Sequence, residues 1–252
     1  MRVVALVSWF DEPDHLLEDC VASLRGFCDA VICLDGPYAT YFYDDAQSPP
    51  SNLAAIARGA QQAGIPVYIH LAHGPWMGEC EKRTAMFRLG ERHTTPDDWF
   101  FCIDADERVL EHGYTRDRLE AATNYDAGTV LLMESDSLGC LIIPQLFRAH
   151  RGITIGPAHY QYSLPDGRRL WCCHNETVER LDTHHDIIVE HRVKERSEAR
   201  EARRWAYYLR RDSQQMEVPD FDPVPDPQPG ALGCDTLAAG PQVAPGLALA
   251  RQ

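Results

Sequence analysis

The first 36 residues, MRVVALVSWFDEPDHLLEDCVASLRGFCDAVICLDG, indicate the fold class. Residues 3–8 are a short β-branched apolar run, which is typical of a buried parallel strand. Residues 14–26 place apolar side chains at helical spacing and stop at Gly26, and residues 30–36 read as a second strand. A strand, a helix and a second strand in this order form a βαβ unit, for which a parallel sheet is the usual outcome.

The same alternation continues along the chain. It predicts helices over 53–64 and 79–92, and strands over 65–71 and 99–103. Further strands are expected over 129–135, 140–147 and 187–190, with a turn at 136–139 and a short strand or loop within 152–162. The sequence therefore predicts an α/β fold with a mostly parallel central sheet flanked by helices.

We expect one domain over residues 1–216, divided into an N-terminal half, 1–110, and a second half, 111–216, that ends in a charged helix over 194–216. Residues 217–252 are rich in proline, glycine and alanine and have little to bury, so they are expected to form a disordered tail.

Composition excludes several classes of protein. A net charge of −14, from 24 basic and 38 acidic residues, argues against binding a long nucleic acid, because that affinity depends on neutralised phosphates. Nine cysteines without a CxxC pair favour a reducing compartment. No apolar stretch is long enough to be a signal peptide core or to span a bilayer, so a soluble, cytoplasmic protein is expected, with contact to a membrane surface left open.

The stretch FFCIDADERVL, residues 100–110, carries three carboxylates at the end of an apolar run. Asp104 and Asp106 lie two residues apart, which places both side chains on the same side of an extended segment. They are suited to bind one hard divalent cation, Mg²⁺ or Mn²⁺, that also coordinates phosphate oxygens. The alternative is structural, since carboxylates often cap the helix or turn that follows a strand.

Three polar segments follow strands of the predicted parallel sheet: residues 8–12, 35–38 and 104–107. Open parallel sheets bind ligands beyond the carboxyl ends of their strands. We therefore expect these segments to lie along one edge of the sheet and to form a ligand site.

This ordered set of segments resembles the GT-A glycosyltransferases, especially glycosyltransferase family 2, over roughly residues 1–150. The resembling stretches are WFDEP at 9–13, LDG at 34–36, EKR at 81–83 and WFFCIDADE at 99–107. The resemblance implies a Rossmann-like GT-A sheet and a UDP- or GDP-sugar donor lying across the strand ends.

By resemblance, each motif also implies a role. Phe10 and Glu12 would border the nucleoside, and Asp35 would contact the base or the ribose. Asp104 and Asp106 would be the DxD pair that binds the metal ion with the donor diphosphate. Some GT-A enzymes complete the metal shell with a late histidine, and His191, after an apolar strand, is placed for that role.

Lys82 and Arg83 lie on the helix before the acidic strand end. In the resembling enzymes, basic residues of this segment reach the donor phosphates, and arginine can do so with two hydrogen bonds. The alternative is that both belong to a solvated helix face. The charged helix over 194–216 also has two readings: a packed helix with Glu–Arg pairs, or a basic aromatic face that docks an acceptor, a partner or anionic lipid.

An inverting transferase needs a carboxylate to take the proton of the acceptor hydroxyl. The candidates are Glu134, Asp136, Asp166 and Glu176, which sequence spacing does not rank. His159 is a further candidate, in a segment similar to the Gly-x-x-His-Glu of some family 2 enzymes, although Tyr160 replaces the glutamate. His184 and His185 are expected to be loop residues. A retaining enzyme does not necessarily require such a base, so the stereochemical course stays open.

The leading hypothesis is a metal-dependent glycosyltransferase that moves a sugar to a hydroxyl acceptor. A sugar nucleotidyltransferase is the alternative among enzymes, but its usual glycine-rich basic loop is absent, because the loop after the first strand reads SWFDEP. An inactive module that binds a glycan or a protein is the alternative outside enzymes. The sugar, the nucleotide, the acceptor and the oligomeric state stay open.

Overall fold

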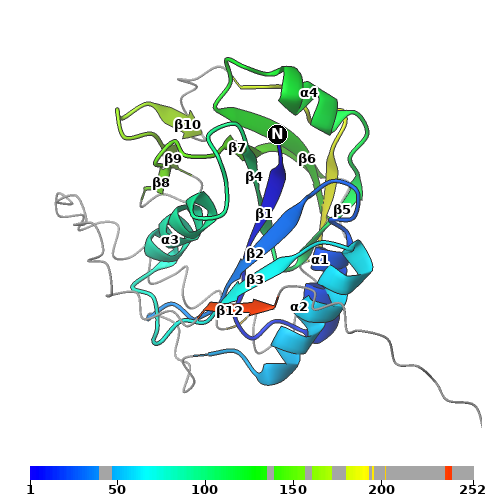
Figure 1. Ribbon diagram of the computed structural model, residues 1–252, viewed down its shortest axis with the longest axis vertical. Coiled ribbons are helices and arrows are strands. Elements are labelled where there is room, and N and C mark those ends of the chain that lie inside the picture. Colours follow the sequence, from blue (N-terminus) through cyan, green and yellow to red (C-terminus); the bar gives the residue numbers. More distant parts are fainter. Residues whose placement is uncertain are drawn as a thin grey trace, which may run out of the picture.

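The structure is a computed structural model, and it describes residues 1–39, 47–134, 139–156, 161–171, 180–192, 195, 202 and 236–239. It has a mixed α/β fold (Figure 1). The helices are α1 (Asp14–Ala22), α2 (Pro50–Ala63), α3 (Glu79–Glu91) and α4 (Thr115–Ala121). The strands of the main sheet are β1 (Val3–Ser8), β2 (Ala30–Leu34), β3 (Val67–His70), β4 (Trp99–Asp104), β5 (Glu107–Glu111), β6 (Ala127–Glu134), β7 (Cys140–Arg148), β11 (Ile188–His191) and β12 (Thr236–Ala239). A small second sheet contains β8 (Thr154–Ile155), β9 (Tyr162–Ser163) and β10 (Arg169–Trp171).

The N-terminal half forms the predicted parallel unit. Strands β3, β2, β1 and β4 lie in this order and run parallel. Alternate residues of β1 point to opposite faces: Val3, Ala5 and Val7 pack with α1 and α2, whereas Val4 and Leu6 pack with α3. Figure 1 shows α1 and α2 together on one side of these strands and α3 on the other.

The rest of the main sheet corrects the expectation that the sheet is mostly parallel. Strand β7 runs antiparallel to both β4 and β6, and β5 runs antiparallel to β11. The physical reason is the length of the connections. Strands β6 and β7 are joined directly as a hairpin, and only antiparallel strands can be joined in this way, since a parallel pair needs a long crossover.

The tail also departs in part from the expectation. Residues 236–239, within the segment expected to be disordered, form β12 and pair antiparallel with β3 at the edge of the main sheet. An edge strand such as β3 presents unpaired backbone groups, which a further strand can satisfy. The rest of the tail and all but two residues of the predicted helix over 194–216 lie outside the described residues.

Strand β5, helix α4 and strand β10 were also not predicted. Strand β5 begins within the acidic segment itself, and helix α4 follows it. Strand β5 has two exposed residues at its end, and α4 has seven residues, so neither carries a strong hydrophobic period.

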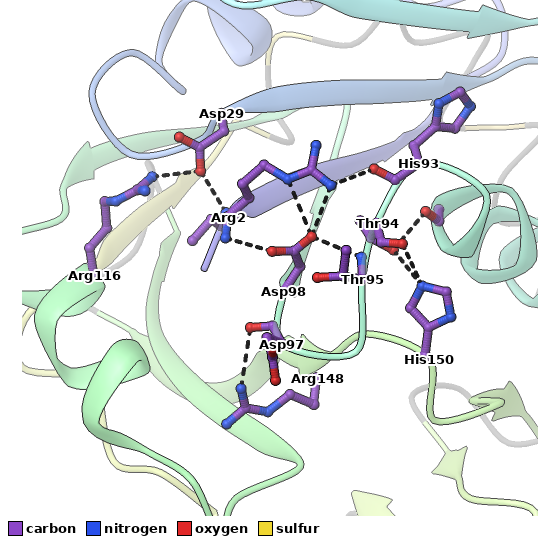
Figure 2. Close-up of polar contacts among 12 residues, drawn as sticks. Arg2, Asp29, His93, Thr94, Thr95, Asp97, Asp98, Arg116, Arg148 and His150 are labelled. Atoms are coloured by element: carbon purple, nitrogen blue, oxygen red, sulfur yellow. Dashed lines mark hydrogen bonds and ion pairs between the residues drawn. The ribbon is translucent and has the colours of Figure 1, made fainter.

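Polar contacts at the amino ends of β1 and β4 hold the central strands in register (Figure 2). The buried Asp98 carboxylate accepts hydrogen bonds from the backbone N–H of Arg2 at 2.7 Å and from the backbone N–H of Thr95 at 2.9 Å. The Arg2 guanidinium donates to the same carboxylate at 2.9 Å. Asp98 directly precedes β4, so these bonds tie the start of β4 to the start of β1.

No helix within the described ranges is long and apolar enough to cross a membrane.

Candidate functional site

The acidic segment lies where the order of the parallel strands reverses. The chain passes from β1 to β2 and β3 on one side, and then returns to place β4 on the other side of β1. Ser8, the last residue of β1, is the register partner of Asp104, the last residue of β4. The carboxyl ends at such a switch point are where open α/β sheets bind ligands. The expected shared edge of residues 8–12, 35–38 and 104–107 is therefore present.

Arg83 contacts the first carboxylate of this segment. One guanidinium nitrogen of Arg83 lies 2.7 Å and 3.0 Å from the two carboxylate oxygens of Asp104. A second nitrogen donates to Glu79 at 2.9 Å, one helical turn earlier on α3. Arg83 is buried and the Asp104 side chain is 25% exposed. Arg83 is therefore not on a solvated helix face, and its partner at the strand end is a carboxylate.

His191 contacts the second carboxylate. Its Nε2 lies 3.0 Å from a carboxylate oxygen of Asp106, which is almost fully buried. Burial by itself lowers the pKa of His191, but Asp106 outweighs this effect and raises the pKa above its ordinary value. His191, which the resemblance implies as a late histidine of a metal shell, thus lies beside Asp106 across 85 residues of chain, and its role as a ligand stays a prediction.

Arg192 fixes the end of β11 and so places His191. Its backbone N–H donates to the carbonyl oxygen of Asp106 at 2.9 Å. Its guanidinium binds Asp19 of α1 at 2.7 Å and both carboxylate oxygens of Glu195, at 2.7 Å and 2.6 Å. Arg192, which directly follows β11, therefore contacts both the acidic segment and α1.

Glu107 is the third carboxylate of the segment and is buried. One of its oxygens accepts hydrogen bonds from the backbone N–H of Asp104 at 2.9 Å and from the Gln145 amide at 2.8 Å. Burial and the neighbouring charge of Asp104 raise the pKa of Glu107 to about 8. The carboxylates are crowded enough that one of them resists ionisation, which is the condition that a bound cation relieves.

Two side chains of basic residues contact these carboxylates: Arg83 lies beside Asp104, and His191 lies beside Asp106. The donor atoms, carboxylate oxygens and an imidazole nitrogen, suit Mn²⁺ or Mg²⁺. As they stand, Asp104, Asp106 and His191 do not bring three ligand atoms within 4.8 Å of one another, whereas another group among the described residues does. A cation bound by all three residues would therefore require their side chains to move closer together.

Of the two base candidates that the structure describes, Glu134 and Asp166, it is Glu134 that strand register places beside this segment. His191 of β11 is paired with Glu107 of β5 on one side and with Glu134 of β6 on the other. Paired residues of neighbouring strands project to the same face of a sheet, so these three side chains form one row. Glu134 is exposed at the end of β6.

The other acid–base candidates are separate from this row or lie outside the described residues. Asp166 is in the exposed turn between β9 and β10, where its carboxylate accepts hydrogen bonds from Arg168 at 3.0 Å and 2.7 Å. Asp136, His159 and Glu176 lie outside the described residues.

Lys82 holds the ends of two strands together. Its buried ammonium donates to the carbonyl oxygens of Trp9 and Gly36, both at 2.7 Å, directly after β1 and β2. The ring of Tyr38 lies 5.7 Å from the same ammonium, within the range of a cation–π contact. Lys82 therefore has a structural role: it stabilises the edge of the sheet on which a ligand would lie.

Replacing Lys82 with methionine is expected to lower the free energy of unfolding by about 2 kcal/mol, because two buried carbonyl oxygens lose a donor. Urea unfolding of the full chain measures this loss. The matched control is Arg25→Met, which removes an exposed cation and should change the free energy by less than about 0.5 kcal/mol. Equal stabilities of Lys82→Met and the control would contradict the structural role of Lys82.

Asp35, which is fully buried, is engaged within the fold. Its two carboxylate oxygens accept hydrogen bonds from the backbone N–H of Ser48 at 2.8 Å and from the Ser48 hydroxyl at 2.6 Å. The same hydroxyl accepts a hydrogen bond from the backbone N–H of Asp11 at 2.8 Å. Asp35 therefore links the ends of β1 and β2 to the segment before α2. Phe10 and Glu12 are buried in the same loop after β1.

Gln145, Ser48 and Arg192 contribute to the site and were not predicted from the sequence. Gln145 has a signal that sequence reasoning passed over: it is a polar residue inside the apolar strand CLIIPQLF. A buried polar side chain in such a run requires a partner, which here is Glu107. Ser48 and Arg192 have no comparable signal, because the contacts that tie them to the site are not local: Asp35 lies 13 residues from Ser48, and Asp19 lies 173 residues from Arg192.

Comparison with known proteins gives little further information. No family model and no curated protein matches this chain. Among solved structures, the fold is similar in part to mannose-6-phosphate isomerase from Helicobacter pylori, with 8% sequence identity and a TM-score of 0.34. The alignment covers 54% of this chain and 52% of the isomerase, so the chain spans about half the length of that structure.

Proposed function

We propose that this chain is a metal-dependent glycosyltransferase of the GT-A type, which moves a sugar from a nucleotide-diphosphate sugar to a hydroxyl acceptor. The observation that carries the proposal is the position of Asp104 and Asp106 at the switch point of the parallel strands, with Arg83 and His191 brought to them from distant segments. Anionic ligands with a bound cation suit this combination of carboxylates, an imidazole and a guanidinium.

In this proposal Asp104, Asp106 and His191 hold Mn²⁺ or Mg²⁺ when the donor binds. The cation supplies a Lewis acid that offsets the negative charge developing on the leaving diphosphate. Arg83 already lies at hydrogen-bonding distance from Asp104, so a small movement of its guanidinium turns it toward a phosphate oxygen beside that carboxylate. The buried Lys82 keeps the ends of β1 and β2 in place around the donor.

Glu134 is proposed as the base that takes the proton of the acceptor hydroxyl. It is exposed at the carboxyl end of β6, and its register partner His191 contacts Asp106. A catalytic base must be accessible to an acceptor that arrives from solvent, and it must lie near the donor. Neither Glu107 nor Asp106 offers that access, because both are buried.

Calorimetric titration of the full chain with UDP- and GDP-sugars, with and without Mn²⁺, tests the proposal. We expect one nucleotide-sugar to bind only when the cation is present, and release of the nucleoside diphosphate when a suitable acceptor is added. Release of pyrophosphate would instead indicate a sugar nucleotidyltransferase. Absence of binding to every nucleotide-sugar would contradict the proposal and favour an inactive binding module.

A further inference from the structure

A second group of metal-ligand side chains lies far from the acidic segment. Asp182, His184 and His185 each offer one ligand atom, and these atoms all lie within 4.8 Å of one another. The three residues precede β11, whereas His191 ends it at the edge that carries Asp104. The group is therefore at the amino ends of the strands, at the opposite edge of the sheet.

The backbone of this turn is held on both sides by the main sheet. Leu181 exchanges backbone hydrogen bonds with β6, donating to Ala127 at 2.9 Å and accepting from Thr129 at 3.0 Å. Thr183 is fully buried, and its hydroxyl donates to the carbonyl oxygen of Thr129. The backbone N–H of Ile187 then donates to the carbonyl oxygen of Thr183 at 3.1 Å. The turn is thus anchored within the chain before any ion binds.

The side chains between these anchors converge. Nδ1 of His184 contacts a carboxylate oxygen of Asp182, and the ring centroids of His184 and His185 lie 3.9 Å apart at an interplanar angle of 43°. The contact with Asp182 explains the placement of His184, but it does not explain why a second imidazole lies against the first. Two adjacent imidazoles with a carboxylate are a typical ligand set for a transition-metal ion.

We propose that Asp182, His184 and His185 bind one divalent transition-metal ion, with Zn²⁺ as the representative cation. Tetrahedral Zn²⁺ holds its ligand atoms about 3.3 Å apart, so small rotations of the side chains are sufficient to close the site. Asp182 and His185 are exposed, so water can complete the coordination. Mg²⁺ binds this set weakly, because it prefers oxygen ligands in an octahedral arrangement.

The test is a titration of the full chain, freed of metal with EDTA, in a Cys140→Ser background that removes an exposed thiol. Calorimetry with ZnCl₂ is expected to show a site that the double variant His184→Ala, His185→Ala weakens by more than about tenfold. The control His73→Ala removes an exposed histidine elsewhere and should leave the affinity unchanged. Nuclear magnetic resonance of the histidine rings should show Zn²⁺-dependent shifts of His184 and His185.

Unchanged ring signals of His184 and His185 at saturating Zn²⁺, or equal affinities of the double variant and the His73→Ala control, would overturn the proposal. Circular dichroism of the metal-free double variant checks that the turn still folds. The outcome is independent of the proposed glycosyltransferase, because Asp106→Asn should leave this Zn²⁺ site intact whether or not the chain transfers a sugar.

Discussion

Replacing Asp106 with asparagine is expected to reduce sugar transfer by about 10²-fold or more and to remove the dependence of donor binding on Mn²⁺. The substitution keeps the size of the side chain but removes the charge that faces His191 at 3.0 Å. The proposed cation would then lose a ligand, and His191 would lose its carboxylate partner. Steady-state rates with the nucleotide-sugar identified by titration measure the effect.

The matched control is Asp117→Asn, which removes one exposed carboxylate from α4. It should transfer sugar at the rate of the unaltered chain. Because Asp106 is buried, the Asp106→Asn protein must also be shown to fold, by circular dichroism and thermal unfolding. A folded variant that keeps full activity in excess EDTA would exclude the metal-dependent mechanism.

Replacing Asp98 with alanine is expected to lower the free energy of unfolding by about 3 kcal/mol at neutral pH. The change leaves the backbone N–H groups of Arg2 and Thr95 without the carboxylate that accepts their hydrogen bonds (Figure 2). It also leaves the Arg2 guanidinium without its carboxylate, but this term is small because the Arg2 side chain is 49% exposed. Urea unfolding measures the loss.

The effect of Asp98 should depend on pH. Burial by itself raises the pKa of Asp98, but hydrogen bonds from Thr95 and Arg2 outweigh it and hold the pKa below its ordinary value. A carboxyl group with a lowered pKa stabilises the fold above its unfolded pKa of about 4, and this stabilisation is lost as the pH falls through the folded pKa. The difference between the unaltered chain and Asp98→Ala should therefore shrink below about pH 4.

The exposed neighbour Asp97 provides the control for this prediction. Asp97→Ala removes the same charge one residue earlier and should change the free energy of unfolding by less than about 0.5 kcal/mol. Equal losses for the two variants would mean that the network at the start of β4 contributes no more than general surface charge.

The N-terminal half of the fold was predictable because its signals are local. Residues 3–8 form β1 with the predicted bounds, and α3 and β4 each differ from expectation by one residue. Each of these elements carries its own hydrophobic period and its own boundary residues. Strand β5 could not be predicted, because its Glu107 is buried by partners, Gln145 among them, that come from other strands.

The candidate site also combines features that the sequence predicted with features that only the structure shows. Asp104, Asp106 and Arg83 were identified from a short motif and from their order along the chain, and the structure brings all three to one strand end. Lys82 and Asp35 are in the expected region, but their contacts are with the chain itself: Lys82 binds two backbone carbonyl oxygens and Asp35 binds Ser48. Sequence spacing does not distinguish a side chain that contacts a ligand from one that stabilises a loop of the chain itself.

The sequence by itself determined the βαβ start of the domain and the acidic end of β4, because hydrophobic period and residue type act over a few neighbouring positions. Only the tertiary structure decided that the sheet is mixed, that His191 reaches Asp106, and that Asp182, His184 and His185 converge before β11. These features depend on strand pairing between distant segments. That pairing is set by the burial of both faces of the sheet and by the satisfaction of backbone hydrogen bonds, which no short stretch of sequence contains.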